Sequence, residues 1–273
     1  MTSFRRIGLV AWHVFKESVR DRVLYAIGAF ALLLVASSIL IGQITAGEDV
    51  KYIKDIGLVA IELAGLLMTV FIGVGLVARE IERRSIFGLL AKPLPRWEFI
   101  VGKYCGLLLT ILVNIAGMTA ALYLMLAWMD WGELEVVRAS WDAPAVDPRL
   151  LIQVSFIAAE MALLTAIALF FSTFSSSALL SVAFTVGLYV MGQFSGDLRN
   201  FGDMVEVPGA IASIVAGIGW SVPAFSVFDV KGEVVHHLPI GAAKVASTLL
   251  YSALYSVVAL SGAVAIFSRR EFK

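Results

Sequence analysis

Cysteine is nearly absent from this 273-residue sequence, and charged residues make up only 15% of it. The one cysteine, Cys105, lies in an apolar stretch, so a disulfide bond within the chain is excluded. Basic and acidic residues number 21 each, and the resulting net charge of zero gives no support to nucleic-acid binding. The first residues, Met1 to Arg6, open a charge-dotted segment and not a short apolar core, so we expect no cleaved signal peptide.

Motifs that would give the chain a chemistry of its own are also missing. A phosphate-binding loop needs Gly-x-x-x-x-Gly-Lys-Ser/Thr, but the only Gly-Lys pair, Gly102-Lys103, precedes Tyr104. No Ser-His-Asp or Cys-His grouping can be placed together. His236 and His237 have no third metal ligand at a diagnostic spacing, and the eight methionines are scattered. We therefore expect no catalytic residue, no metal and no cofactor on this chain.

Apolar residues, in contrast, make up 60% of the sequence, where soluble domains typically have roughly 45–50%. A helix needs about 20 mostly apolar residues to cross the hydrocarbon core of a membrane. Six stretches meet this requirement: Val23–Ile44, Ile56–Ala78, Tyr104–Met129, Leu150–Phe171, Ala178–Ser195 and Val245–Ser268. The sequence thus predicts an all-α integral membrane protein with six transmembrane helices, in a single domain over residues 1–273.

The basic residues indicate how these six helices are oriented. Of the 21 lysines and arginines, 14 fall in segments on one side of the membrane: Arg5, Arg6, Lys16, Arg20, Arg22, Arg79, Arg83, Arg84, Lys92, Arg96, Lys103, Arg269, Arg270 and Lys273. Cytoplasmic segments of membrane proteins carry the excess of lysine and arginine. We therefore expect both termini in the cytoplasm and the segment 196–244 outside.

One stretch in that outer segment, Val207–Phe228, is uncharged and long enough to be a seventh span. It contains Pro208, Pro223 and three glycines, and a full crossing would move the basic C-terminus outside. We interpret it as a re-entrant or interfacial pair of helices, since broken backbone is tolerated at membrane depth where protein or a wet cavity surrounds it. A seventh span is the alternative.

Two cytoplasmic segments have distinctive patterns. Residues 1–22 show helical periodicity, with an apolar stripe that includes Phe4, Val14 and Ser18 opposite a basic arc, which is typical of a helix lying in the headgroup plane. The loop 79–103 has charge pairs at helical spacing and is stopped by Pro93 and Pro95. This loop is either a docking element or a solvated loop whose bases set the topology.

The loop and its surroundings resemble a known family. The residues that carry the resemblance are Arg79–Ile86, Leu90–Phe99 with Gly102-Lys103, Leu169–Ser177 and Val222–Asp229. They are similar to the permease subunits of ABC transporters of the second, exporter-like type, and most similar to the branch labelled multi-copper-enzyme maturation permeases. The resemblance implies six spans, an N-terminal elbow helix, a cytoplasmic coupling helix and outer re-entrant helices before the last span.

The resemblance also implies partners and a cellular location. The family works as two permease copies, identical or different, with two separate ABC ATP-binding subunits that hold ATP and Mg²⁺, here in a prokaryotic plasma membrane. Residues Glu80 to Phe87 would form the coupling helix and Ser172–Ser177 a second contact with the ATPase. The coupling residues carried over are Glu80, Glu82, Arg83, Arg84, Ile86 and Phe87.

Glu62 and Glu160 are the only charges inside the six predicted spans. Ionisable groups within a bilayer are costly and mark functional sites by default, so both are candidates for the translocation pathway; a protonated or structural role is the alternative. We expect Asn114, Gln153 and Gln193 to join helices. Gly65, Gly73 and Gly75 would allow close helix packing.

These features favour the membrane subunit of an ATP-driven exporter of an amphipathic or lipid-like substrate, with no ATPase activity of its own. A second hypothesis is a membrane scaffold that anchors an ATPase and acts through residues 196–244. A third, a secondary transporter that uses Glu62 and Glu160 as proton sites, is disfavoured because no internal repeat is visible.

Overall fold

The computed structural model describes residues 3–42, 49–75, 95–133, 135–138, 141, 143–175, 177–204 and 208–269. Every regular element in these residues is helical. Their bounds are α1 Ser3–Val19, α2 Arg22–Gly42, α3 Asp49–Met68, the π-helical turn η1 Thr69–Val74, α6 Arg96–Gly132, α7 Glu135–Arg138, α8 Leu150–Phe174, α9 Ala178–Gln193, α10 Ser195–Arg199, α11 Phe201–Met204, α12 Gly209–Ser221, the 3₁₀ turn η2 Phe225–Phe228, α13 Lys231–Val235 and α14 Ala242–Arg269.

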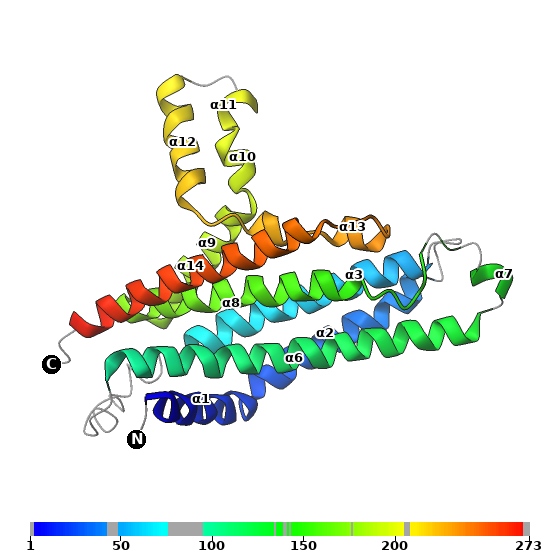
Figure 1. The fold of residues 1–273 in the computed structure, drawn as a ribbon, viewed down its shortest axis with the longest axis horizontal. Coiled ribbons are helices and arrows are strands. Elements are labelled where there is room, and N and C mark those ends of the chain that lie inside the picture. The colour runs from blue at the N-terminus through cyan, green and yellow to red at the C-terminus, as the bar shows by residue number, and fades with distance from the viewer. Residues whose placement is uncertain are drawn as a thin grey trace.

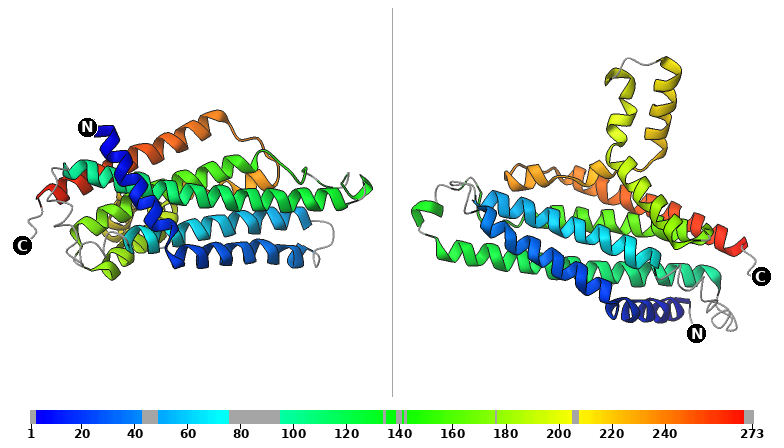
Figure 2. Two further views of the ribbon diagram at one scale, coloured as in Figure 1. Left: turned by 90° about the horizontal axis from the view of Figure 1, so that it is seen from below. Right: turned by 180° about the vertical axis from the view of Figure 1, so that it is seen from behind.

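Five long helices, α2, α3, α6, α8 and α14, run side by side as an elongated bundle (Figure 1). The first helix, α1, and the last turn of α14 lie at one end, which we call the terminal end, and α7 lies at the opposite end, the α7 end. The two further views show that α1 crosses α6 obliquely at the terminal end (Figure 2). Both described chain ends are therefore on the same side of the bundle.

Four of the described helices are long and apolar enough to cross a membrane: Val50–Gly73, Arg96–Gly132, Leu150–Phe174 and Ala242–Arg269. They correspond to the second, third, fourth and sixth predicted spans. The fifth is the shorter apolar helix α9, Ala178–Gln193, and the first lies within α2, which has 21 residues. The 16 residues of α9 cover only ~24 Å of a hydrocarbon core about 30 Å thick. The structure is that of an all-α membrane protein, and the count of six spans stays a prediction.

Helix boundaries differ from the predicted ones where charged residues continue a helix beyond its apolar run. The third span was expected to begin at Tyr104, but α6 begins at Arg96 and extends for 37 residues, or ~55 Å. The last eight residues of the predicted loop 79–103 are therefore the first two turns of α6. A helix can continue through polar residues as long as its backbone hydrogen bonds are made. The start of the apolar run is therefore not the start of the helix.

The predicted outer segment 196–244 divides into two parts with different surroundings. Helices α10, α11 and α12, which we call the lateral arm, project sideways from the bundle (Figure 1). The arm is held together by Arg199, whose Nε donates to the Gly219 carbonyl at 3.0 Å and whose guanidinium lies over the Trp220 ring. After a break at residues 222–224, which contains Pro223 as expected, the chain turns by 48° into η2 and α13.

The second part of that segment packs into the bundle. Phe225, Phe228 and Val230 are fully buried in the core that α3, α6 and α8 build. This segment also packs closely on α9 at Gly192. A Cβ atom at Gly192 would lie 2.4 Å from the Phe225 ring and 2.5 Å from the Pro223 carbonyl oxygen, which explains the glycine there. This docking carries the polar residues that follow Val230 into the interior of the protein.

Candidate functional site: a polar cluster inside the bundle

Five polar side chains from four elements meet inside the bundle, and we call them the polar cluster. Lys231 Nζ of α13 lies 2.7 Å from Glu62 Oε2 of α3. Gln193 Nε2 of α9 donates to Glu160 Oε1 of α8 at 3.1 Å and to the Tyr189 hydroxyl at 3.0 Å. The two halves interact electrostatically through Glu160, Glu62 and Lys231. The cluster therefore joins α3, α8, α9 and α13 at one place.

The backbone around Lys231 is fixed by hydrogen bonds from side chains of two long helices. Gln153 Oε1 of α8 accepts from the Val230 amide at 2.9 Å. The Tyr251 hydroxyl of α14 accepts from the Ala224 amide at 2.7 Å. Buried backbone amides need such partners, and here side chains supply them because a broken helix cannot. The position of the Lys231 ammonium thus depends on α8 and α14 together.

Burial makes the cluster sensitive to the balance of its charges. Glu160 is 2% exposed, and the side chains of Glu62 and Lys231 are about one-sixth exposed. Asp229 adds a third carboxylate, with Oδ2 3.7 Å from Lys231 Nζ. A buried ion pair is costly to form but far more costly to leave half-made. The Lys231 ammonium is therefore what allows the carboxylates of Glu62 and Glu160 to lie in this cluster.

The structure brings the two predicted pathway candidates, Glu62 and Glu160, into the same cluster. Gln153 and Gln193 do join helices as expected, whereas Asn114 donates to the Thr110 carbonyl of its own helix at 2.8 Å. Sequence reasoning missed Lys231, which it left in the outer segment. The missed signal is a lysine directly after Phe225, Phe228 and Val230, since apolar side chains that dock carry their neighbour inward.

The predicted coupling residues Glu80, Glu82, Arg83, Arg84, Ile86 and Phe87 lie outside the described residues. The helices on either side of them are described. The chain re-enters at Arg96, whose guanidinium donates to the Phe267 and Ser268 carbonyls at the end of α14, at 3.0 and 2.8 Å. Phe99 of α6 also stacks on Phe267. The chain segment that leaves the loop is thereby fastened to the last helix.

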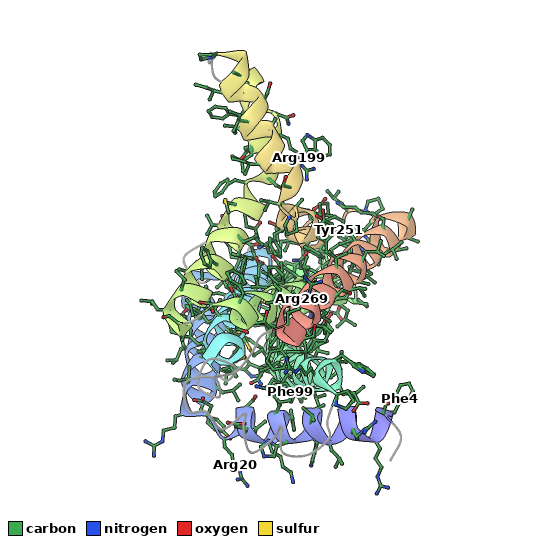
Figure 3. All side chains as sticks on the ribbon, turned by 90° about the vertical axis from the view of Figure 1, so that its left-hand side faces the viewer. Phe4, Arg20, Phe99, Arg199, Tyr251 and Arg269 are labelled. Carbon is green, nitrogen blue, oxygen red and sulfur yellow. The ribbon has the colours of Figure 1, made fainter. Side chains whose placement is uncertain are left out.

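At the same terminal end, α1 lies against the first turns of α6 (Figure 3). A Cβ atom at Gly102 would lie 2.7 Å from Val10 Cβ, and one at Gly106 would lie 2.5 Å from the Ala11 carbonyl oxygen. Two glycines four residues apart form one bare strip on a helix, which lets two helices approach closely. The sequence analysis overlooked this pair.

An ion pair adds to the contact between α1 and α6. The guanidinium of Arg6 contacts the carboxylate of Glu98 at 2.9 and 3.0 Å, and Glu98 is almost fully buried. Val14 and Ser18 of the predicted apolar stripe face this contact, while Phe4 and Trp12 are exposed. Val14 and Ser18 of the predicted stripe are thus buried against the bundle, whereas Phe4 at its start is not.

The second predicted contact with an ATPase, Ser172–Ser177, is the turn between α8 and α9. Ser172, Thr173 and Ser175 are buried, and Ser172 and Thr173 donate to carbonyls of their own helix. Phe174 and Ser177 are exposed. A partner at this turn would meet chiefly the Phe174 ring, which the sequence did not single out.

A second set of polar contacts, the clamp, holds the connection between α7 and α8. The fully buried Asp147 carboxylate lies 2.6 Å from His237 Nδ1 and accepts from the Arg149 amide at 2.9 Å. The Arg149 side chain donates to the His237 carbonyl, and the buried Lys54 ammonium donates to the Pro144 carbonyl at 2.7 Å. His237 therefore serves as a partner of Asp147, and in the described residues no three His, Cys, Asp or Glu side chains group as metal ligands.

The clamp gives a prediction for pH dependence. Burial raises the pKa of Asp147, but hydrogen bonds from the Arg149 amide and His237 and the charge of Lys54 outweigh it and leave the pKa below its ordinary value of 3.8. A carboxyl group with a lowered pKa contributes stability above its unfolded pKa and loses that contribution as the pH falls through its folded pKa. We expect Asp147→Asn to cost about 1–3 kcal/mol at pH 7 and much less near pH 3.

The measurement is the unfolding midpoint in detergent from pH 7 to pH 3. The matched control is Asp55→Asn, because Asp55 is an exposed acid at the same end of the bundle. If the Asp147→Asn and wild-type midpoints stay the same distance apart over the whole range, the carboxylate is not what stabilises the clamp.

Comparison with known families and proteins places this arrangement of helices. The sequence model of the family described as "ABC-2 family transporter protein" matches residues 9–272, nearly the whole chain. A comparison with curated proteins gave no match. The chain thus belongs to the ABC-2 transporter family, as a multi-pass transmembrane subunit of the kind that works with ABC ATP-binding subunits.

Proposed function

We propose that this chain is the permease subunit of an ATP-driven exporter in a prokaryotic plasma membrane. Two separate ATP-binding subunits, each with ATP and Mg²⁺, energise a pair of permease copies, and the substrate is amphipathic or lipid-like. The family match over residues 9–272 is the observation that carries this proposal. The position of Glu62, Glu160 and Lys231 inside an apolar bundle supports a translocation route that includes a polar site.

The terminal end is the proposed cytoplasmic side. The helix residues Arg6, Lys16, Arg96 and Arg269 lie at this end, as does Arg20 directly after α1. Cytoplasmic ends of membrane helices collect such residues. The loop that contains the proposed coupling helix also leaves η1 and enters α6 here. A partner ATPase would therefore meet the protein at this end.

The contacts at the terminal end support a mechanism for coupling. A displacement of the loop reaches α6 directly, α14 through the bonds of Arg96 to the Phe267 and Ser268 carbonyls, and α1 through the close contacts at Gly102 and Gly106. Three helices would thus move together when the ATPases close. In the bundle interior, a tilt of the helices changes the contact between α3 and α13 that Lys231 and Glu62 make.

The test is reconstitution of the chain with the ATP-binding subunit that co-purifies with it. Reversing the charges of Glu80, Arg83 and Arg84 is expected to abolish co-purification, while Glu160→Gln retains the complex but lowers ATP-dependent transport about tenfold. The expected tenfold loss corresponds to one lost charge-assisted hydrogen bond. Reversing the exposed Lys244 alone changes the net charge of the chain by the same amount and serves as the charge-matched control.

Two outcomes would contradict the proposal. If the purified chain moves substrate without any nucleotide-binding partner, it is not a permease subunit of this kind. If Glu160→Gln transports as the wild type does, Glu160 is only structural. The scaffold hypothesis is favoured by one observation, the lateral arm with the exposed Ile214 and Trp220. An assembled complex whose ATPase activity moves no substrate would support that hypothesis instead.

A further inference from the structure

A cavity of about 290 Å³ lies between the first two turns of α3 and the segment 232–236 at α13. Its lining includes one residue of each charge: Lys51, Tyr52, Asp55, Gly232, Val235 and His236. The polar cluster, the clamp and the coupling loop use none of these six residues. The cavity is therefore a site separate from those described so far.

The charges in the cavity wall are arranged for a ligand that carries both signs. Lys51 and Asp55 are four residues apart, on the same face of α3 and one turn apart along it. Tyr52 adds a hydroxyl beside them, and His236 adds an imidazole from the opposite wall. Within the part of the chain that the structure describes, no ion pair engages the Asp55 carboxylate. An anionic group suits Lys51 and His236, and a primary ammonium suits Asp55 and Tyr52.

The wall opposite α3 is held in place before any ligand binds. His236 directly precedes His237, which adopts a left-handed backbone conformation with φ of 55°. The clamp fixes that conformation, because Asp147 holds the His237 ring and Arg149 holds its carbonyl. On the other side, Lys231 ties the start of α13 to Glu62 of α3. A preformed wall spares a ligand the cost of ordering it.

An apolar stripe leads from the cavity along α3 toward the middle of the bundle. Tyr52, Asp55, Val59 and Leu63 follow one another at helical spacing, and Tyr52, Val59 and Leu63 are 42%, 43% and 36% exposed. This stretch belongs to the candidate span Val50–Gly73, whose first turns carry the cavity. A molecule with its polar group in the cavity would therefore lay an apolar chain on this stripe, within the membrane.

We propose that the cavity binds the headgroup of a phospholipid that carries a phosphate and a primary ammonium, with an acyl chain along Tyr52, Val59 and Leu63. The phosphate lies against Lys51 and His236, and the ammonium donates to Asp55 and the Tyr52 hydroxyl. A trimethylated ammonium has no proton to donate, and a glycerol headgroup leaves Asp55 without a cation. The site therefore selects phosphatidylethanolamine over phosphatidylcholine and phosphatidylglycerol.

The experiment measures lipid retention by native mass spectrometry, on the full chain in detergent with each of the three lipids added in turn. Phosphatidylethanolamine is expected to bind about tenfold more tightly than the other two. Asp55→Asn and Lys51→Met are each expected to abolish that preference for phosphatidylethanolamine. Lys244→Met changes a surface lysine outside the cavity and is expected to leave the preference unchanged. The unfolding midpoint of each variant shows that the fold is retained.

Competition by soluble glycerophosphoethanolamine separates the two sources of the headgroup. Weak displacement of the lipid, at millimolar concentration only, supports a membrane lipid as the occupant. If the soluble compound binds as tightly as the lipid, the acyl stripe contributes nothing and the lipid assignment is wrong. Equal retention of all three lipids, or retention that neither variant lowers, also overturns the proposal. None of these outcomes depends on ATP, a partner subunit or transport.

Discussion

Replacing Lys231 with methionine is expected to lower the free energy of unfolding by about 3 kcal/mol. Methionine keeps the length of the side chain and its apolar stem, so the substitution removes mainly the ammonium. Glu62 then loses its partner at 2.7 Å, and Glu160 and Asp229 lose the ammonium with which the described residues balance them. Breaking a buried pair by removing one partner typically costs about 3–5 kcal/mol, and partial exposure of this pair places it at the lower end. Thermal and denaturant unfolding in detergent measure the change.

A second lysine–glutamate pair in the same region is the control. Lys244 Nζ lies 3.0 Å from Glu233 Oε1, with both side chains exposed by more than a third. Exposed ion pairs contribute about 0–1 kcal/mol, so Lys244→Met should be nearly silent. Exchanging the charges in the double variant Lys231→Glu with Glu62→Lys should recover part of the loss. Similar effects of Lys231→Met and Lys244→Met would show that the polar cluster does not stabilise the bundle.

Substituting leucine for Gly106 is expected to detach α1 from α6. The first added atom, Cβ, would lie 2.5 Å from the Ala11 carbonyl oxygen and 2.7 Å from Val14 Cβ, so the two helices must separate. Separation breaks the Arg6–Glu98 ion pair and exposes the α1 face that contains Val14 and Ser18. Limited trypsin digestion should cut within α1, after Lys16 or Arg20, many times faster than in the wild type. Loss of ATP-dependent transport should accompany the cleavage.

Gly117 lies on the same helix, eleven residues further along, and provides a matched control. A Cβ atom there meets nothing within 4 Å, so Gly117→Leu adds the same side chain to an open surface. Its trypsin pattern should equal that of the wild type. If Gly106→Leu also leaves the pattern unchanged, α1 is not held by the glycine contact, and the ion pair alone must hold it.

The sequence was sufficient to predict which segments are helical and apolar, because the apolar runs are long enough to form helices. Leu150–Phe171 was expected as a span, and the observed helix is Leu150–Phe174. The break near Pro223 could also be predicted, because proline removes a backbone donor and blocks the preceding turn. These features are local, since neighbours along the chain determine them.

Features that depend on contacts between distant segments could not be predicted. Glu62 was identified, but its partner Lys231 is 169 residues away and becomes visible only when η2 and α13 dock. The four-residue spacing of Gly102 and Gly106 is typical of a close helix contact, but it does not identify α1 as the partner.

The length of α6 has a mechanical consequence. Its 37 residues form an uninterrupted rod of ~55 Å, nearly twice the thickness of the hydrocarbon core. If a rod of this length pivots at its midpoint, a rotation of about 10° displaces its two ends by ~5 Å each, in opposite directions. A modest push at Arg96 would thus arrive at Gly132 as a movement of the same size, without any bond in between having to break.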